Sequence, residues 1–231
     1  PWFAGDTLPY VVWAIHNMRP GKYKNIAWLS LLTGSRLSEV LSISTEDIVN
    51  GDKGGVYWVI PSHKVESNKN IEENRPIVRP LPAEIVSFLK SIHPEQGNYY
   101  FPSKNKALKH KHLSDSNLPN IKCAIQEILD EKSITYPYFT MKSFRKTVAS
   151  WITDKFNRDT RELVLGHFSS DLDLRYDQTA QLNTKMKAYK WWATKLYELK
   201  ETDPFTEQVA TDMEWGAFSE TELSLALTKK Q

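Results

Sequence analysis

Residues 32–41, Leu-Thr-Gly-Ser-Arg-Leu-Ser-Glu-Val-Leu, place a glycine turn between two predicted helices. Upstream, residues 22–33 repeat apolar side chains at helical spacing, and downstream a short helix is expected to turn Leu37, Val40 and Leu41 inward. Arg36 stands at the start of that short helix, where a guanidinium and backbone N–H groups together can bind a phosphate. The alternative interpretation is a surface arginine paired with Glu39.

Outside this stretch, the pattern predicts a mostly helical chain with one small antiparallel sheet. Residues 56–61 and 75–81 have the composition of strands and form a hairpin with a long polar connection. The further predicted helices span residues 8–18, 82–92, 114–130, 140–156, 159–165 and 183–199.

The amino-acid composition excludes several classes of protein. The 231 residues are 40% hydrophobic and 25% charged, which is enough apolar material for one large domain or a domain with an appendage. No apolar run approaches the roughly 20 residues of a membrane helix, and no signal peptide opens the chain. The lone Cys123 excludes an internal disulfide and a cysteine-rich zinc site, which favours a reducing cytoplasm.

The net charge of +2 hides an uneven distribution along the chain. Residues 1–200 carry 28 basic and 21 acidic side chains, whereas residues 201–227 carry seven acidic and no basic ones. A basic body favours a polyanionic partner, although ordinary surface variation is the alternative. We expect one domain over residues 1–200 and an acidic tail over residues 201–231, which docks on its own body or on a neighbouring protomer.

Two further segments hold candidate functional residues. Lys142 and Arg145, three residues apart, share a helix face and repel each other unless an anion or acids lie nearby; a solvated helix face is the alternative. His167 and Tyr176 are nine residues apart, and the break between them lets both face one pocket. Taken singly, this histidine is more typical of a helix-end hydrogen bonder and this tyrosine of a core residue.

Together these pieces resemble the catalytic domain of the tyrosine recombinases, the phage-integrase family. The resemblance covers about residues 8–180, and the spacings of 22 residues from Arg145 to His167 and nine to Tyr176 match the family's usual ones. It implies the fold of a DNA breaking-rejoining enzyme. Residues 58–61 and 80–82 further resemble the hairpin of prophage-type integrases. The matching segments are Thr-Gly-Ser-Arg-Leu-Ser-Glu-Val-Leu at 33–41, Phe-Arg-Lys-Thr at 144–147, Leu-Gly-His at 165–167 and Arg-Tyr at 175–176.

The resemblance implies a role for each residue. Tyr176 would attack a DNA phosphodiester, form a 3′-phosphotyrosyl link and free a 5′-hydroxyl. Arg36 and Arg145 would clamp the non-bridging oxygens, and His167 would be a further donor. Because the guanidinium groups supply the positive charge, no metal or other cofactor is expected. A tyrosine hydroxyl, with an ordinary pKa near ~10, is a tolerable leaving group, which keeps the covalent step reversible.

Two assignments are less direct. The family uses a hairpin lysine as general acid, for which we choose Lys64, with Lys69 as the competitor because the hairpin is long. The residue three before the second arginine is usually histidine, and here it is Lys142. A protonated lysine can donate to phosphate, but it cannot accept the proton of the tyrosine.

The resemblance also implies partners and a setting. We expect an integrase or excisionase-assisted recombinase of a prophage or genomic island, acting on double-stranded DNA attachment sites as a tetrameric synapse, with accessory DNA-bending or directionality proteins and no membrane. The expected location is the bacterial cytoplasm, at the nucleoid. An N-terminal core-binding domain, usual in such enzymes, is missing from this chain, which suggests a fragment. A cleavage-defective DNA-binding relative and a type IB topoisomerase are the alternatives.

Overall fold

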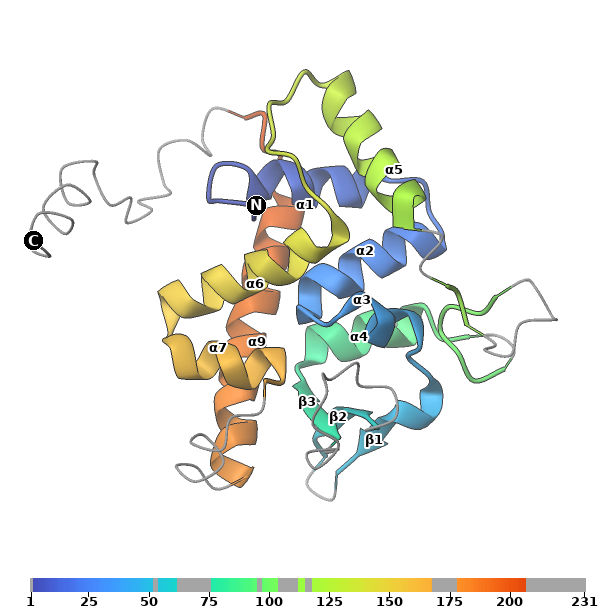
Figure 1. Cartoon of the computed structure of the whole chain (residues 1–231), viewed down its shortest axis with the longest axis vertical. Coiled ribbons are helices and arrows are strands. Elements are labelled where there is room, and N and C mark those ends of the chain that lie inside the picture. Colours follow the sequence, from blue (N-terminus) through green and yellow to red (C-terminus); the bar gives the residue numbers. More distant parts are fainter. Residues whose placement is uncertain are drawn as a thin grey trace, which may run out of the picture.

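The computed structural model describes residues 2–51, 54–61, 76–94, 97–103, 112–114, 118–167 and 178–206 (Figure 1). Helices dominate, as predicted, and the last of them begins five residues earlier than the sequence pattern indicated. In chain order the elements are α1 (Leu8–Asn17), α2 (Lys22–Thr33), α3 (Leu37–Leu41), the 3-10 helix η1 (Thr45–Asp47), β1 (Ile48–Asn50), β2 (Val56–Ile60), β3 (Ile77–Leu81), α4 (Ala83–Ser91), α5 (Leu118–Glu131), α6 (Met141–Lys155), α7 (Arg158–Leu165) and α9 (Gln178–Glu201).

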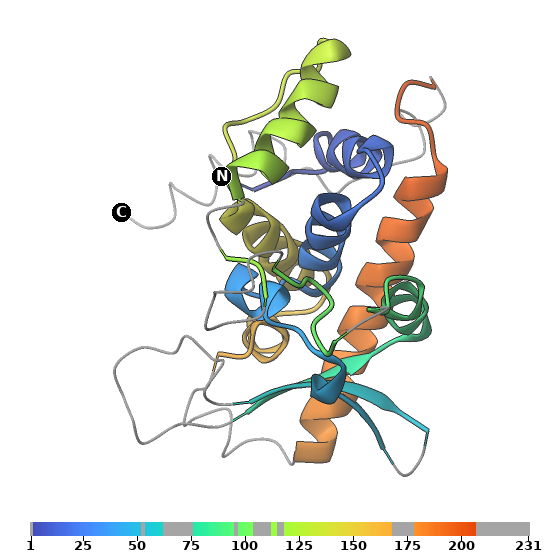
Figure 2. The same ribbon diagram turned by 90° about the vertical axis from the view of Figure 1, so that its right-hand side faces the viewer.

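A three-stranded antiparallel sheet lies at one end of the molecule, in the order β1-β2-β3 (Figure 2). The predicted hairpin is formed by β2 and β3, with Trp58 opposite Arg79. Strand β1 was not predicted, because its three residues are too few to show an alternating pattern. A glycine turn joins β1 to β2, in which the Gly51 N–H donates to the Gly55 carbonyl at 2.7 Å.

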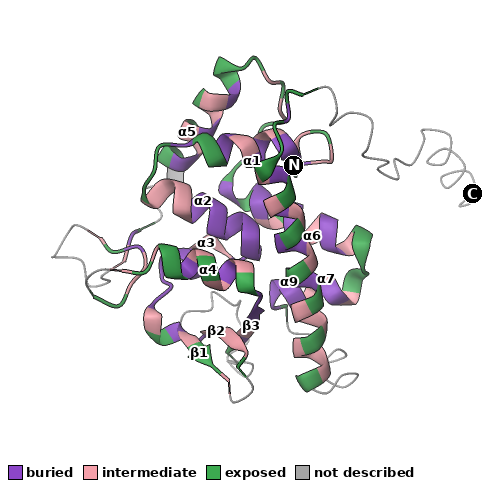
Figure 3. Cartoon of the chain, turned by 180° about the vertical axis from the view of Figure 1, so that it is seen from behind, coloured by how far each residue is buried: buried purple, intermediate pink, exposed green. Residues whose placement is uncertain are grey.

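Helix α2 runs through the middle of the fold and packs against α1, α3, α5, α6 and α9. Its residues 26–33 are all buried, so this part of the helix is enclosed on every side rather than along one stripe. Figure 3 shows this buried centre, with exposed residues concentrated on the outer helices. The interior of the domain is therefore organised around the helix that ends at the Gly34 turn.

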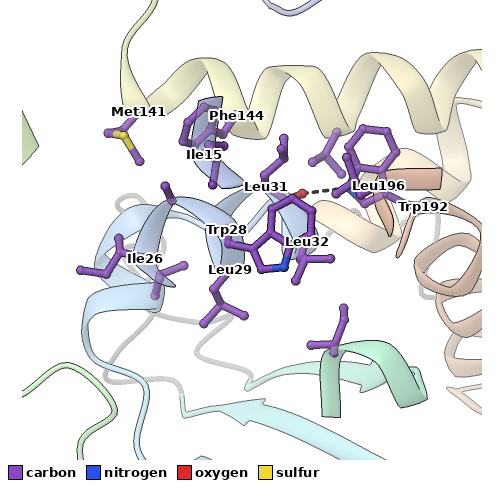
Figure 4. Close-up of a cluster of buried hydrophobic side chains, with 14 of the residues drawn as sticks. Ile15, Ile26, Trp28, Leu29, Leu31, Leu32, Met141, Phe144, Trp192 and Leu196 are labelled. Carbon is purple, nitrogen blue, oxygen red and sulfur yellow. Dashed lines mark hydrogen bonds between the residues drawn. The ribbon is translucent and has the colours of Figure 1, made fainter. Parts of the chain in front are cut away.

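Helix α9 runs along the molecule from β3 to α1 and ties the sheet to the helical part (Figures 1 and 2). Trp192 on α9 is fully buried, and its indole N–H donates to the Leu31 carbonyl of α2 at 2.8 Å (Figure 4). A buried indole needs such a partner for its N–H group. None of the helices in the described segments has the length and apolar character that crossing a membrane requires.

Glycines end two helices in the left-handed conformation. Gly34 ends α2 with φ of 59°, and Gly166 ends α7 with φ of 69°. A Cβ on Gly34 would lie 2.9 Å from Val148 Cγ1 of α6, and one on Gly166 would lie 2.9 Å from Ile77 Cγ2 of β3. Both positions therefore require glycine for conformation and for close packing.

After α9 the chain turns back on the body of the domain. Phe205 packs against Tyr10 and Trp13 of α1, with ring centroids 5.5 and 4.9 Å apart, and Lys132 Nζ lies 5.7 Å from the Phe205 ring. The start of the predicted tail thus contacts its own domain, whereas residues 207–231 lie outside the described part of the chain.

Candidate active site

Arg145 projects from α6 and bonds to the ends of two other helices. Its Nη1 donates to the Gly34 carbonyl at 2.8 Å, and its Nη2 donates to the Leu165 carbonyl at 2.8 Å. Helix C-termini leave carbonyl groups without intrahelical partners, and a guanidinium satisfies them while complementing the helix dipole. Arg145 is thereby held between the turn that precedes Arg36 and the end of α7.

Arg36 is the residue immediately before α3 and is paired with Glu39, which lies in the first turn of that helix. The Arg36 backbone N–H donates to Glu39 Oε2 at 2.9 Å, and Arg36 Nη1 donates to Glu39 Oε1 at 2.9 Å. The side chain of Arg36 is 26% exposed, whereas that of Glu39 is fully buried. The pair is therefore not the surface ion pair considered from sequence, because its carboxylate lies inside the protein.

Arg79 of β3 shares this carboxylate, and the sequence analysis missed it. Its Nη2 donates to Glu39 Oε2 at 2.8 Å, and its side chain is 1% exposed. An arginine in a strand pattern is ordinarily read as an exposed residue. The only sequence signal was its place between two apolar strand positions, Ile77 and Leu81, which alternation assigns to the same face.

The three arginines and one carboxylate form a positively charged cluster, which we define as Arg36, Arg79, Arg145 and Glu39. Burial, with the nearby positive charges of Arg79 and Arg36, lowers the pKa of Arg145 to about 10. Arg145 nevertheless stays charged at neutral pH, so the cluster carries two positive charges in excess. An anion placed here would relieve both the repulsion and part of the desolvation.

His167 completes the surroundings of Arg145. Its Nε2 lies 3.1 Å from Arg145 Nη2, and its Nδ1 contacts a carboxylate oxygen of Glu162. Because a guanidinium can only donate, Nε2 must accept and the ring proton sits on Nδ1. Burial raises the pKa of Glu162, but hydrogen bonds from Arg161 and His167 outweigh it and lower that pKa overall.

Of the other predicted site residues, one is exposed on the same helix as Arg145, and the rest lie outside the described segments. Lys142 is exposed on α6, one turn before Arg145. Tyr176, Lys64 and Lys69 fall among the residues that the structure does not describe. The structure thus brings Arg36, Arg145 and His167 together and leaves the expected nucleophile and general acid untested.

The described residues also form a cavity away from this cluster. A cavity of about 360 Å³ lies at the opposite end of α2, against Trp28, Tyr197, Lys24 and Lys200. It contains none of the predicted site residues. Within the described ranges, no three His, Cys, Asp or Glu side chains gather in a way that could hold a metal ion.

Comparison with known proteins gives a fold but no close relative. No protein-family model matches the chain, and no curated protein matches it. A crystal structure of XerH site-specific recombinase bound to difH substrate, a pre-cleavage complex, matches with a TM-score of 0.52 and 17% identity over 82% of this chain and 49% of that one. A post-cleavage complex of XerH with palindromic difH substrate matches with a TM-score of 0.52 and 17% identity over 85% and 51%.

The chain therefore spans about half the length of the solved structures it matches. The likeness confirms the predicted fold class, a mostly helical domain with a small three-stranded antiparallel sheet and the architecture of a tyrosine-recombinase catalytic domain.

Proposed function

We propose that this chain is the catalytic part of a site-specific tyrosine recombinase, which cleaves and rejoins DNA strands through a 3′-phosphotyrosyl intermediate. The observation that carries the proposal is the bond between Arg145 and the Gly34 carbonyl, two residues before Arg36. It brings two arginines from distant parts of the sequence to one place, on the fold of a recombinase solved in complex with DNA.

The free donors of the two arginines support binding of a phosphate. A guanidinium has five N–H donors. Among the described residues, Arg145 directs three of them to Gly34, Leu165 and His167, and the other two have no partner there. Within the described segments, Arg36 directs one side-chain donor to Glu39, and its other four have no partner. Donors held in place before the reaction stabilise the charge of a five-coordinate phosphorus without further reorganisation.

In the proposed reaction, the Tyr176 oxygen forms a bond to phosphorus as the bond to the 5′-oxygen breaks. The tyrosine proton leaves to a base, and the departing 5′-oxygen takes a proton from Lys64 or Lys69. His167 Nε2 accepts from Arg145 in the free protein, so the histidine orients that guanidinium. The role of a further donor to the phosphate, which the resemblance implies, would require a proton on Nε2. Strand exchange follows when the 5′-hydroxyl of a second strand attacks the phosphotyrosine.

The wider role is proposed with the reaction. We infer that the enzyme integrates or excises a prophage or genomic island at double-stranded attachment sites, within a tetrameric synapse on the bacterial nucleoid, assisted by DNA-bending or directionality proteins. The uneven charge supports a polyanionic partner for residues 1–200.

A DNA-binding relative that no longer cleaves is the second candidate. The observation in its favour is Lys142, an exposed cation where the family usually has histidine. A lysine ammonium donates to phosphate but takes no proton from a tyrosine. In this alternative the cluster binds a phosphodiester, and the DNA leaves unchanged.

Covalent capture separates the two candidates. The protein is incubated with a pool of nicked duplexes whose arms are randomised around the nick, and the products are resolved under denaturing conditions. A protein–DNA band that maps to Tyr176, and is absent in Tyr176→Phe, supports the recombinase. Binding without any covalent band supports the second candidate, and a band that persists in Tyr176→Phe contradicts the proposed nucleophile. Relaxation of supercoiled DNA without a selected site would indicate a type IB topoisomerase.

A further inference from the structure

We propose that Arg79 is a positioning residue of the anion site: by sharing the Glu39 carboxylate, it leaves the positive charge of Arg36 available for a phosphate. The inference rests on the proposed function for the identity of the anion. It assigns a role to a residue whose side chain is buried and which is therefore distinct from the two arginines that would touch the substrate.

Arg79 occupies a core position in β3. Ile77, Arg79 and Leu81 lie on one face of the strand, and all three are buried. Across the sheet, the Trp58 ring lies 5.8 Å from the centre of the guanidinium. An apolar residue would fill such a place at no electrostatic cost, because a buried charge must be compensated by its partners.

The buried guanidinium of Arg79 has hydrogen-bond partners for only part of its N–H groups among the described residues. Its Nη groups donate to Glu39, to the Tyr189 hydroxyl at 2.9 Å and to the Val164 carbonyl. Its Nε, however, has no partner among the described residues. A buried ion pair is on its own a poor source of stability, since an apolar replacement is often neutral or better. The arrangement is better explained by what the charge does at the site.

Glu39 shows what that charge does. Burial raises the pKa of this carboxyl, but the positive charges and hydrogen bonds of Arg79 and Arg36 outweigh it, so the pKa is lowered overall. With Arg79 present, one carboxylate faces two guanidiniums. Without Arg79, Glu39 would neutralise Arg36 alone, and the excess charge of the cluster would fall from two to one.

Arg79 also anchors the end of α7. It donates to the Val164 carbonyl, one residue before the Leu165 carbonyl that accepts from Arg145. The Tyr189 hydroxyl, from α9, donates to the same Val164 carbonyl at 3.0 Å. The position of Arg145 and the charge left on Arg36 therefore both depend on one buried side chain.

The test uses inorganic phosphate as the probe and the full chain. Binding is followed by the NMR signals of arginine Nε–H groups, with assignment of Arg36 and Arg145. We expect Arg79→Met to weaken phosphate binding about tenfold, which corresponds to about 1.4 kcal/mol. Arg158→Met, which removes an exposed arginine of α7, is the matched control and should leave binding unchanged.

A double variant separates charge from packing. Arg79→Met with Glu39→Gln removes one charge of each sign and restores an excess of two. We expect it to bind phosphate several-fold more tightly than Arg79→Met alone, whereas a packing role predicts no recovery. If Arg79→Met does not fold, Arg79→Gln takes its place, because its amide can still donate to Val164.

The outcomes distinguish this inference from the proposed function. Phosphate affinity unchanged in a folded Arg79→Met protein, or a double variant no better than the single one, overturns the role of Arg79 even if the wild-type chain cleaves DNA. The expected affinities together with an absence of any covalent DNA adduct support the role of Arg79 and contradict the proposed recombinase activity.

Discussion

Arg145 donates through Nη1 to the carbonyl oxygen of Gly34 at 2.8 Å, so an α6 side chain is bonded to the turn that ends α2. The two residues are 111 positions apart. Arg145 and Arg36 are the two candidate phosphate-binding residues. The contact therefore joins Arg145 to the backbone turn that positions Arg36.

The first prediction concerns the stability of the two arginine variants. Arg145→Ala leaves the Gly34 and Leu165 carbonyls without this donor, and we expect a loss of about 2 kcal/mol in the free energy of unfolding. Arg36→Ala should cost less than about 1 kcal/mol, because Glu39 keeps Arg79 as its partner. Urea denaturation measures both. Equal losses would contradict the distinct structural roles.

The second prediction tests the glycine turn. Gly34→Ala places a methyl group 2.9 Å from Val148 Cγ1 in addition to the strain of a positive φ. Gly54→Ala is the matched control, since its φ is 77° and no atom of the described residues lies within 4 Å of the added Cβ. We expect Gly34→Ala to lose roughly 1–3 kcal/mol more than the control in chemical denaturation. If the two variants lose the same amount, packing against α6 is not what requires glycine at position 34.

Elements that depend on nearby residues were predicted well from the sequence, whereas those that depend on contacts between distant segments were not. Helices α6 and α7 were predicted within one residue of their observed ends, because an apolar stripe and the C-terminal Gly166 are local signals. Strand β1 was missed because pairing with β2, rather than any pattern of its own, makes it a strand. Alternation within β3 indicated which face Arg79 occupies but not that an arginine would be buried there.

In the candidate site, too, local motifs could be predicted from the sequence and a contact between distant segments could not. Arg36, Arg145 and His167 could be named from motif order, and the structure places them together. The partner of Arg79, however, lies 40 positions away, and nothing in the sequence around either residue indicates the contact. Ion pairs between distant segments depend on the packing of the whole domain, which a local pattern does not contain.

The third prediction concerns acid. The pKa of Glu39 is lowered in the folded protein, so above its ordinary unfolded value, near 4.5, both states are ionised and the full stabilisation is present. As the pH falls below that value, the unfolded state binds the proton first, and this stabilisation is lost progressively down to the folded pKa. The unfolding free energy of Glu39→Gln should therefore fall less steeply with decreasing pH in this window.

Glu131→Gln, which removes one negative charge from an exposed position on α5, is the matched control variant. The wild-type protein and both variants are compared by denaturant titrations repeated at several pH values. An identical slope in Glu39→Gln and the wild-type protein would show that this carboxyl titrates alike in the folded and unfolded states.

The fourth prediction addresses the lysine that replaces the usual histidine. Lys142→His supplies a group that can accept a proton, and we expect it to raise the rate of covalent adduct formation several-fold if proton removal from Tyr176 limits cleavage. Lys146→His, which alters an exposed lysine one turn further along α6, is the matched control. Adduct formation at the wild-type rate in Lys142→His would show that proton transfer to a group at position 142 does not limit cleavage.

The return of Phe205 to α1 has a practical consequence for where the chain can be shortened. The ring covers part of Trp13 and Tyr10, although the helix before it ends four residues earlier, at Glu201. A truncation at the helix end would remove Phe205 and expose the aromatic rings of Trp13 and Tyr10 to solvent, which favours self-association. A truncation after Thr206 would retain it, so the two boundaries, five residues apart, should yield preparations of different solubility.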